Sequence, residues 1–405
     1  MNDKSRILSL YLVLLAVLVF RIVVHEDHYT TPDSIAYLEA AQQLQGWSMT
    51  GTSQKAEQEI KEIFILWPVG YPASIALVSA LTTLPVLVSS KIVNFIFLGL
   101  IFFLLYRWFG KNAWFITLGF FAYGSLEIMS HTWSEGPFLF LVLLLTYIIS
   151  KDLKREKTSS FLFLKLTLTL FFLFLFRYVG VIYSLFAFLV SVKIFLEGNK
   201  IKALHYWIAL FFSGLMASTY LLYLKLISGH HIFEERFFPF SEQPSDFFKN
   251  LMIGLLNECS LARNYFFKGP PDMLYIFLTL LQVGVVIILF RHRKYLSRPV
   301  LGDWDTKLLV LMGGFYLISI VILRSVSPFD SFDYRLLAPF SFPVMTGLLA
   351  AVSLPRQQPF FKKCSPWIVA FFILSLLVNL PKKYILQSIK KVDSTVTHIV
   401  KWYDE

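Results

Sequence analysis

The stretch ILSLYLVLLAVLVFRIVV, residues 7–24, decides the fold class of this chain. It contains a single charge, Arg21, and about 20 apolar residues are enough for a helix to cross the hydrocarbon core of a bilayer. Lys4 and Arg6 precede the stretch and His25 follows it without a small-residue cleavage site, so we expect an uncleaved first membrane helix. Its amino end is expected in the cytoplasm, with the Arg21 side chain extending to the opposite interface.

The composition extends this interpretation to the whole chain. Of 405 residues, 56% are hydrophobic, 42 are Phe and only 16% are charged, and the mean hydropathy is +0.63. These values exclude a cytosolic enzyme, a disordered protein and a secreted disulfide scaffold. Backbone groups in lipid must be satisfied within helices or a closed barrel, and these apolar runs are too long for barrel strands. We therefore expect an all-α polytopic membrane protein with one integral membrane domain, residues 1–405.

Ten further apolar runs predict, with the first, about eleven membrane helices: 86–106, 113–129, 136–150, 161–176, 179–196, 203–227, 273–290, 308–323, 336–354 and 367–380. Alternation places five connections in the cytoplasm, and all are basic: 107–111, 151–157, 200–202, 291–307 and 356–363. Two long connections, 25–85 and 228–272, fall outside. So does the short tail 381–405, whose lysines make it an exception to the charge rule. Cys259 and Cys364 fall on opposite sides and suggest no disulfide.

The first outside loop has the most informative pattern. Thr31-Pro32-Asp33 is typical of a helix start, with Thr31 as the N-cap. The following run, DSIAYLEAAQQLQG at 33–46, collects Tyr37, Ala40, Ala41 and Leu44 on one face. It predicts an amphipathic helix along the membrane surface. Downstream, WPVGYP at 67–72 is an aromatic turn that opens a short apolar helix ending near Pro85, which we expect to be a second juxtamembrane helix.

These motifs resemble those of the membrane-embedded GT-C glycosyltransferases that use polyprenyl-phosphate sugars. The protein mannosyltransferases that use dolichyl-phosphate mannose and the aminoarabinose transferases of lipid A belong to this group. Further similar motifs follow in order: KIVN at 91–94, SE at 134–135, FRYVG at 176–180 and DYRLLAP at 333–339. The resemblance covers most of the chain. The chain departs from better-known members in having Glu135 where many have Asp, and in lacking a large soluble carboxy-terminal domain.

The resemblance implies transfer of a sugar from a polyprenyl-phosphate donor to a lipid, glycan or protein acceptor, with inversion, at the extracytoplasmic face. Asp33 is then the general base and Glu135 a second acid that orients the acceptor. Arg335 and Arg177 are candidates to hold the donor phosphate. Further expected substrate contacts are Tyr37, Tyr71, His131 and Tyr334. Neither a metal nor a cofactor is predicted, nor is a nucleic-acid partner despite the net charge of +11. We expect a bacterial inner membrane protein.

Simpler interpretations remain open for each of these residues. An acid such as Asp33 stabilises a helix amino end without any catalytic role, and arginines at helix ends serve as interfacial anchors. His131, which precedes Glu135 by one helical turn and could share its helix face, is expected to be a hydrogen-bonded interfacial residue. The segment 229–236 clusters His with acids but has no recognised metal-ligand spacing. At the level of function, the alternatives are a transporter or flippase of a lipid-linked substrate and a scaffold without an active site.

Overall fold

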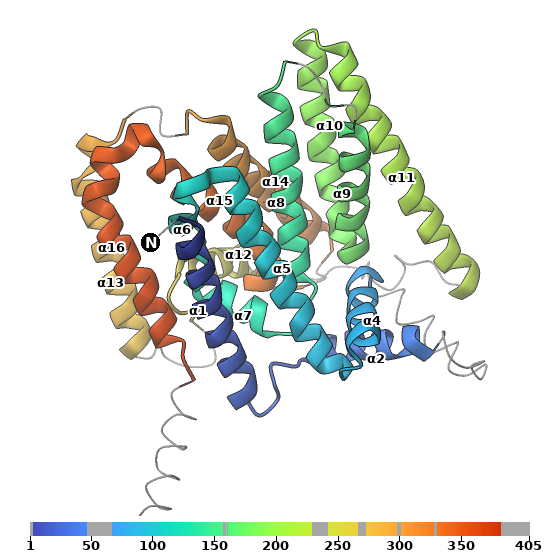
Figure 1. Ribbon diagram of the computed structural model, residues 1–405, viewed down its shortest axis with the longest axis horizontal. Helices are drawn as coiled ribbons and strands as arrows, with labels where there is room; N and C mark the ends of the chain where they lie inside the picture. The colour runs from blue at the N-terminus through green and yellow to red at the C-terminus, as the bar shows by residue number, and fades with distance from the viewer. Residues whose placement is uncertain are drawn as a thin grey trace, which may run out of the picture.

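The computed structural model describes residues 3–46, 67–156, 159, 161–228, 242–265, 273–297, 301–327 and 330–381. Over these residues the chain is helical and contains no strand. Nine helical stretches in this part of the chain are long and apolar enough to cross a membrane. They contain α1 (Asp3–Val24), α5 (Val86–Phe109), α8 (Glu135–Leu153), α10 (Val181–Leu196), α11 (Lys200–Ser228), α13 (Met273–Arg291), α14 (Trp304–Val326), α15 (Tyr334–Ser353) and α16 (Gln358–Val378) (Figure 1). The predicted all-α, multi-pass membrane fold is confirmed.

The outer helices carry their apolar side chains on the surface of the bundle. Of the most apolar 18 consecutive residues of each helix, only 6% are buried in α13 and only 17% in α11. Large side chains such as Phe211, Leu226 and Leu280 are at least 65% exposed. In water such surfaces would aggregate, whereas lipid chains solvate them without cost.

The expected membrane helix at 113–129 is instead a series of short helical pieces. After η1 (Gly110–Asn112) come α6 (Ala113–Ile116), η2 (Thr117–Phe121) and α7 (Tyr123–Ser130), and Ala122 between the last two is extended. The break is tolerated because neighbours satisfy the backbone: Tyr123 N donates to Leu261 O at 2.8 Å, and Ser375 Oγ donates to Phe121 O at 2.8 Å. Hydropathy does not distinguish such a segment, buried in protein, from a continuous membrane helix. The pieces still return the chain from the end of α5 toward the start of α8 (Figure 1).

The five basic connections gather at one end of the bundle, as alternation requires. Hydrogen bonds or ion pairs join them in turn: Asn112 to Ser353, Ser297 to Gln357, Lys154 to Asp305 and Lys202 to the carbonyl of Asp152. The short apolar helix α9 (Leu162–Phe176) runs from this end toward the opposite one. The short helices η4 (Arg293–Tyr295) and η5 (Pro355–Gln357) also lie at the basic end.

The opposite end contains the helices of the first outside loop. The sequence-predicted amphipathic helix is α2 (Pro32–Gly46), which buries Tyr37, Ala40 and Ala41. It packs on α4 (Gly70–Thr82), the expected second short helix, with the rings of Tyr37 and Tyr71 edge to face at 5.1 Å. A third short helix, α12 (Pro244–Cys259), packs against α15.

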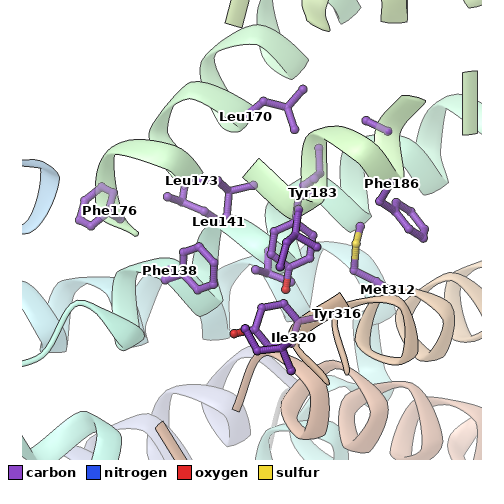
Figure 2. Close-up of a cluster of buried hydrophobic side chains, with 14 of the residues drawn as sticks. Phe138, Leu141, Leu170, Leu173, Phe176, Tyr183, Phe186, Met312, Tyr316 and Ile320 are labelled. Carbon is purple, nitrogen blue, oxygen red and sulfur yellow. The ribbon is translucent and has the colours of Figure 1, made fainter. Parts of the chain in front are cut away.

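A tightly packed apolar layer lies directly beneath this end. Phe138, Leu173, Tyr183, Met312 and Tyr316 bring α8, α9, α10 and α14 together, and the two tyrosine rings stack at 5.9 Å (Figure 2). Such packing fixes the relative positions of the helix ends above it.

Candidate functional site

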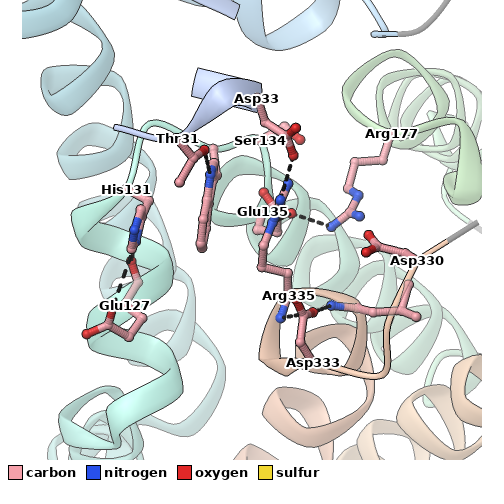
Figure 3. A network of polar contacts seen from close by, with 12 residues as sticks. Thr31, Asp33, Glu127, His131, Ser134, Glu135, Arg177, Asp330, Asp333 and Arg335 are labelled. Carbon is pink, nitrogen blue, oxygen red and sulfur yellow. Dashed lines mark hydrogen bonds and ion pairs between the residues drawn. The ribbon is translucent and has the colours of Figure 1, made fainter. Parts of the chain in front are cut away.

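Four charged side chains from four separate helical segments meet at this end of the bundle (Figure 3). Asp33 comes from α2, Glu135 from the first residue of α8, Arg177 from the end of α9, and Arg335 from the first turn of α15. Arg335 donates from Nη1 to Asp33 Oδ2 at 2.5 Å and from Nε to Glu135 Oε1 at 3.0 Å. Arg177 Nη1 lies 2.9 Å from the same Glu135 oxygen. The structure thus brings together the residues that the sequence assigned to base, second acid and phosphate binding.

Helix N-caps orient the side chains of Asp33 and Arg335. Thr31 caps α2, since its Oγ1 accepts from Ser34 N at 3.3 Å, which confirms the predicted N-cap. Asp333 caps α15 in the same way by accepting from the amides of Arg335 and Leu336. Each cap fixes where its helix begins, and therefore where the next charged side chain points.

Arg177 is presented by a tight turn. It is extended between α9 and η3 (Tyr178–Gly180), and its carbonyl accepts from Gly180 N at 2.7 Å. A side chain on Gly180 would collide with the carbonyl of Leu173, so a glycine is required for this close approach. The Arg177 guanidinium then lies 5.7 Å from the centre of the Phe138 ring, at the edge of the apolar layer.

The four side chains differ in their access to solvent. The Glu135 side chain is 1% exposed, those of Arg177 and Arg335 are 16% and 17% exposed, and that of Asp33 is 27% exposed. Asp33 is therefore the charged group that an incoming molecule meets most readily. Glu135 Oε2 is buried and accepts no hydrogen bond from the described residues, which leaves an acceptor position beside the two arginines.

Trp133 forms a wall of the site, and the sequence analysis did not single it out. The Arg335 guanidinium lies 4.3 Å above its ring, and His131 stacks on the ring at 3.8 Å with an interplanar angle of 6°. Since two groups cannot occupy the same face, they sandwich the indole. Its Nε1 donates to Thr31 Oγ1 at 2.9 Å, so Trp133 also contacts the start of the helix that carries Asp33. Its only sequence signal is its place two residues before Glu135.

The predicted tyrosines fall at different distances from the charges. The hydroxyl of Tyr37 lies 3.0 Å from Ser134 Oγ, next to Glu135, and burial raises its pKa to about 12. Tyr71 is packed behind Tyr37 and donates to Asn94 Oδ1 at 3.1 Å, so it supports α2 without reaching the charged groups. Tyr334 lies beside Trp133, with ring centres 6.0 Å apart.

The expectation that His131 and Glu135 could share one helix face is wrong. α7 ends at Ser130, His131 is extended, and α8 begins only at Glu135, because the intervening residues turn the chain. His131 Nδ1 is 2.9 Å from the carbonyl of Glu127 instead. Burial lowers the pKa of His131 to about 4, so the ring is neutral at pH 7. This position fits the hydrogen-bonded alternative better than direct substrate contact.

The expectation that Arg21 extends to the interface is also wrong. Arg21 is 2% exposed and forms an ion pair with Glu127, while its Nη1 donates to the carbonyl of Asn379 at 2.8 Å. Burial raises the pKa of Glu127, and Arg21 opposes that effect. The pair joins α1, α7 and the end of α16 behind His131. Glu127 escaped the sequence analysis, although an acid within an apolar run is the signal that could have revealed it.

Two further acids lie near Arg335. Burial raises the pKa of Asp330, and it raises that of Asp333 to about 6. The described residues nevertheless contain no group of three or more His, Cys, Asp or Glu side chains arranged to hold a metal ion. The segment 229–236 lies outside the described residues, as do 47–66 of the first outside loop and the lysines of the tail.

In comparisons with known proteins, no family model, curated protein or solved structure matches the chain.

Proposed function

We propose that the protein is a membrane glycosyltransferase that moves a sugar from a polyprenyl-phosphate donor to an acceptor, with inversion and with Asp33 as the general base. The observation that carries the proposal is the convergence of Asp33, Glu135, Arg177 and Arg335 from distant parts of the chain. Two carboxylates and two guanidiniums at one bundle end supply both an acceptor for a proton and cations for a leaving phosphate.

The reaction proposed for this arrangement balances as follows. Asp33 accepts the proton of the acceptor hydroxyl while the hydroxyl oxygen forms a bond to the anomeric carbon. The bond from that carbon to the phosphate oxygen breaks, and the phosphate leaves with the electron pair. Arg335 and Arg177 stabilise the negative charge that grows on the phosphate.

The contact between Arg335 and Asp33 suggests an order of binding. Arg335 Nη1 donates to Asp33 Oδ2 at 2.5 Å, so this carboxylate oxygen already has a partner before any substrate binds. A donor phosphate that binds Arg335 competes for its N–H groups and frees Asp33 Oδ2 to accept the proton of the acceptor hydroxyl. We therefore expect the donor to bind before the acceptor.

Glu135 has a different role in this proposal. With both arginines beside one of its oxygens it is held as a carboxylate, and it positions them. Its Oε2 is buried and lacks a partner among the described residues, and in this proposal it accepts a hydrogen bond from the acceptor once the acceptor has displaced the groups that cover it. The basic connections at the far end favour a cytoplasmic location for that end, which puts the site outside, in keeping with the proposed bacterial inner membrane.

The test is a transfer assay with purified protein and a panel of polyprenyl-phosphate sugars, scored for sugar release or transfer. Asp33→Asn keeps the shape of the side chain but loses its basicity, so turnover should fall at least about 100-fold. The matched control is Asp27→Asn, which changes an exposed carboxylate at the same end of the bundle and should leave turnover unchanged.

The transporter alternative is tested with the same protein in vesicles. Movement of a fluorescent lipid-linked sugar across the bilayer, unchanged by Asp33→Asn and without sugar release from any donor, would replace the transferase proposal.

A further inference from the structure

A recess of about 110 Å³ opens at the basic end, between the end of α8 and the start of α9, far from the Asp33 site. Lys151, Asp152 and Arg155 line it from the α8 side, and Ser159 and Lys165 from the α9 side. A water molecule takes about 30 Å³ of liquid volume, so the recess has room for a small polyatomic group. Its lining combines three cations with one acid.

The carboxylate of Asp152 already has a hydrogen-bond donor and a cation beside it. Asp152 Oδ2 accepts from the hydroxyl of Tyr206 at 3.1 Å and lies 3.7 Å from Lys202 Nζ. By contrast, the side chains of Lys151, Arg155 and Lys165 form no ion pair within the described part of the chain. The Lys151 ammonium lies 5.5 Å from the centre of the Tyr147 ring, but no acid in the described part of the chain pairs with the three cations, so the recess carries an excess of positive charge.

The position of Lys165 is a second, independent observation. Lys165 is exposed on a helix face shared with Phe161, Leu164 and Leu168, whose side chains are 65%, 43% and 39% exposed. These apolar neighbours face lipid, and Lys165 lies in the first turn of α9, from which its side chain reaches the headgroup region. An anionic headgroup is the partner that such a cation meets there.

The length of α9 explains how such a group reaches it. α9 has 15 residues, or about 22 Å at 1.5 Å per residue, whereas the hydrocarbon core is about 30 Å thick. The turn from α10 to α11 extends beyond the start of α9 in Figure 1. With its other end at the opposite membrane face, a helix of this length begins below the near face, so headgroup phosphates would lie level with the recess or just above it.

We infer that this recess binds a phosphate group, with Lys151, Arg155 and Lys165 as its ligands, and that an anionic lipid headgroup whose acyl chains lie along α9 supplies it. The Lys and Arg side chains provide charge-assisted hydrogen bonds, and Ser159 adds a hydroxyl at the rim. A soluble phosphate has the same chemistry, and the experiment separates the two sources.

The experiment measures ligand-dependent thermal stability of the full-length protein in nanodiscs. One arm adds phosphatidylglycerol to phosphatidylcholine discs, and the other adds inorganic phosphate to discs of phosphatidylcholine alone. The variant is Lys151→Gln, Arg155→Gln and Lys165→Gln combined. Each cation near an anionic lipid surface contributes about fivefold to affinity, so the half-saturating ligand concentration should rise about 100-fold in this variant.

A matched control removes the same charges at the same end but outside the recess: Arg107→Gln, Lys111→Gln and Lys362→Gln, all exposed. Stabilisation that is lost in the recess variant and retained in this control supports the site. The arm in which this occurs identifies lipid or soluble phosphate as the source. Equal behaviour of the two triple variants, or no stabilisation of the wild type in either arm, overturns the inference. If the recess variant does not fold, Lys165→Gln alone should still weaken binding about fivefold.

Discussion

Glu135→Gln should destabilise the protein far more than a change at any other acid of the site. Glu135 is 1% exposed and its Oε1 contacts both Arg335 and Arg177. The substitution keeps the shape of the side chain but removes the carboxylate that contacts Arg177 and leaves Arg335 paired with Asp33. Removing one partner of a buried charge cluster costs about 3–5 kcal/mol. At about 2 °C per kcal/mol, the Tm in detergent should fall by about 6–10 °C.

The double variant tests the reason for that loss. Glu135→Gln together with Arg177→Gln restores charge balance, since the pair between Asp33 and Arg335 remains. It should therefore be more stable than the sum of the two single changes predicts, by about 0.5–3 kcal/mol, the range for residues in one network. Glu39→Gln, on the exposed face of α2, is the control and should change stability by less than about 0.5 kcal/mol.

The assay is thermal unfolding of the wild type, the two single variants, the double variant and the Glu39→Gln control in the same detergent, followed by tryptophan fluorescence. A Tm for Glu135→Gln within a degree of the wild type would refute the argument, because the buried cluster would then not depend on its central carboxylate. Additive single effects would show that the cost comes from lost packing and not from charge imbalance.

Two further substitutions and a labelling experiment test neighbouring features. Trp133→Phe keeps a ring between His131 and Arg335 but loses the hydrogen bond to Thr31. The free energy of unfolding should therefore fall by about 1 kcal/mol. Turnover in the transfer assay should fall several-fold. Asp333 has a folded pKa of about 6, above its ordinary value, so the folded state binds more protons and stability falls as pH rises from about 4 to 6. Asn also caps a helix but does not ionise. The free energy of unfolding of Asp333→Asn, relative to that of the wild type, should therefore rise between pH 4 and 6 and level off above it. A difference that stays constant from pH 4 to 7 would contradict this. In intact cells an impermeant thiol reagent should label exposed Cys259 but not buried Cys364, and absence of Cys259 labelling would place the Asp33 end in the cytoplasm.

Patterns local to the sequence predicted the Thr31 cap and the short helices α2 and α4 of the Asp33 end. The Thr-Pro-Asp start of α2, its buried face and the short helix α4 depend on contacts within about one helical turn and on side-chain polarity, which neighbouring residues specify. The prediction for Arg21 was wrong because its contacts are with residues far along the chain. Arg21 is buried because Glu127, over a hundred residues later, lies beside it.

By itself, the sequence determined that this is a helical membrane protein, because a chain with so many long apolar runs has no other way to satisfy its backbone in lipid. Its basic connections also determined which helix ends lie together. Only the tertiary structure decided that residues 113–129 are broken, since Leu261 and Ser375 supply the hydrogen bonds that a continuous helix would make for itself. It alone placed Arg335 between Asp33 and Glu135. Distances between side chains hundreds of residues apart follow from how whole helices pack, and no local pattern specifies that packing.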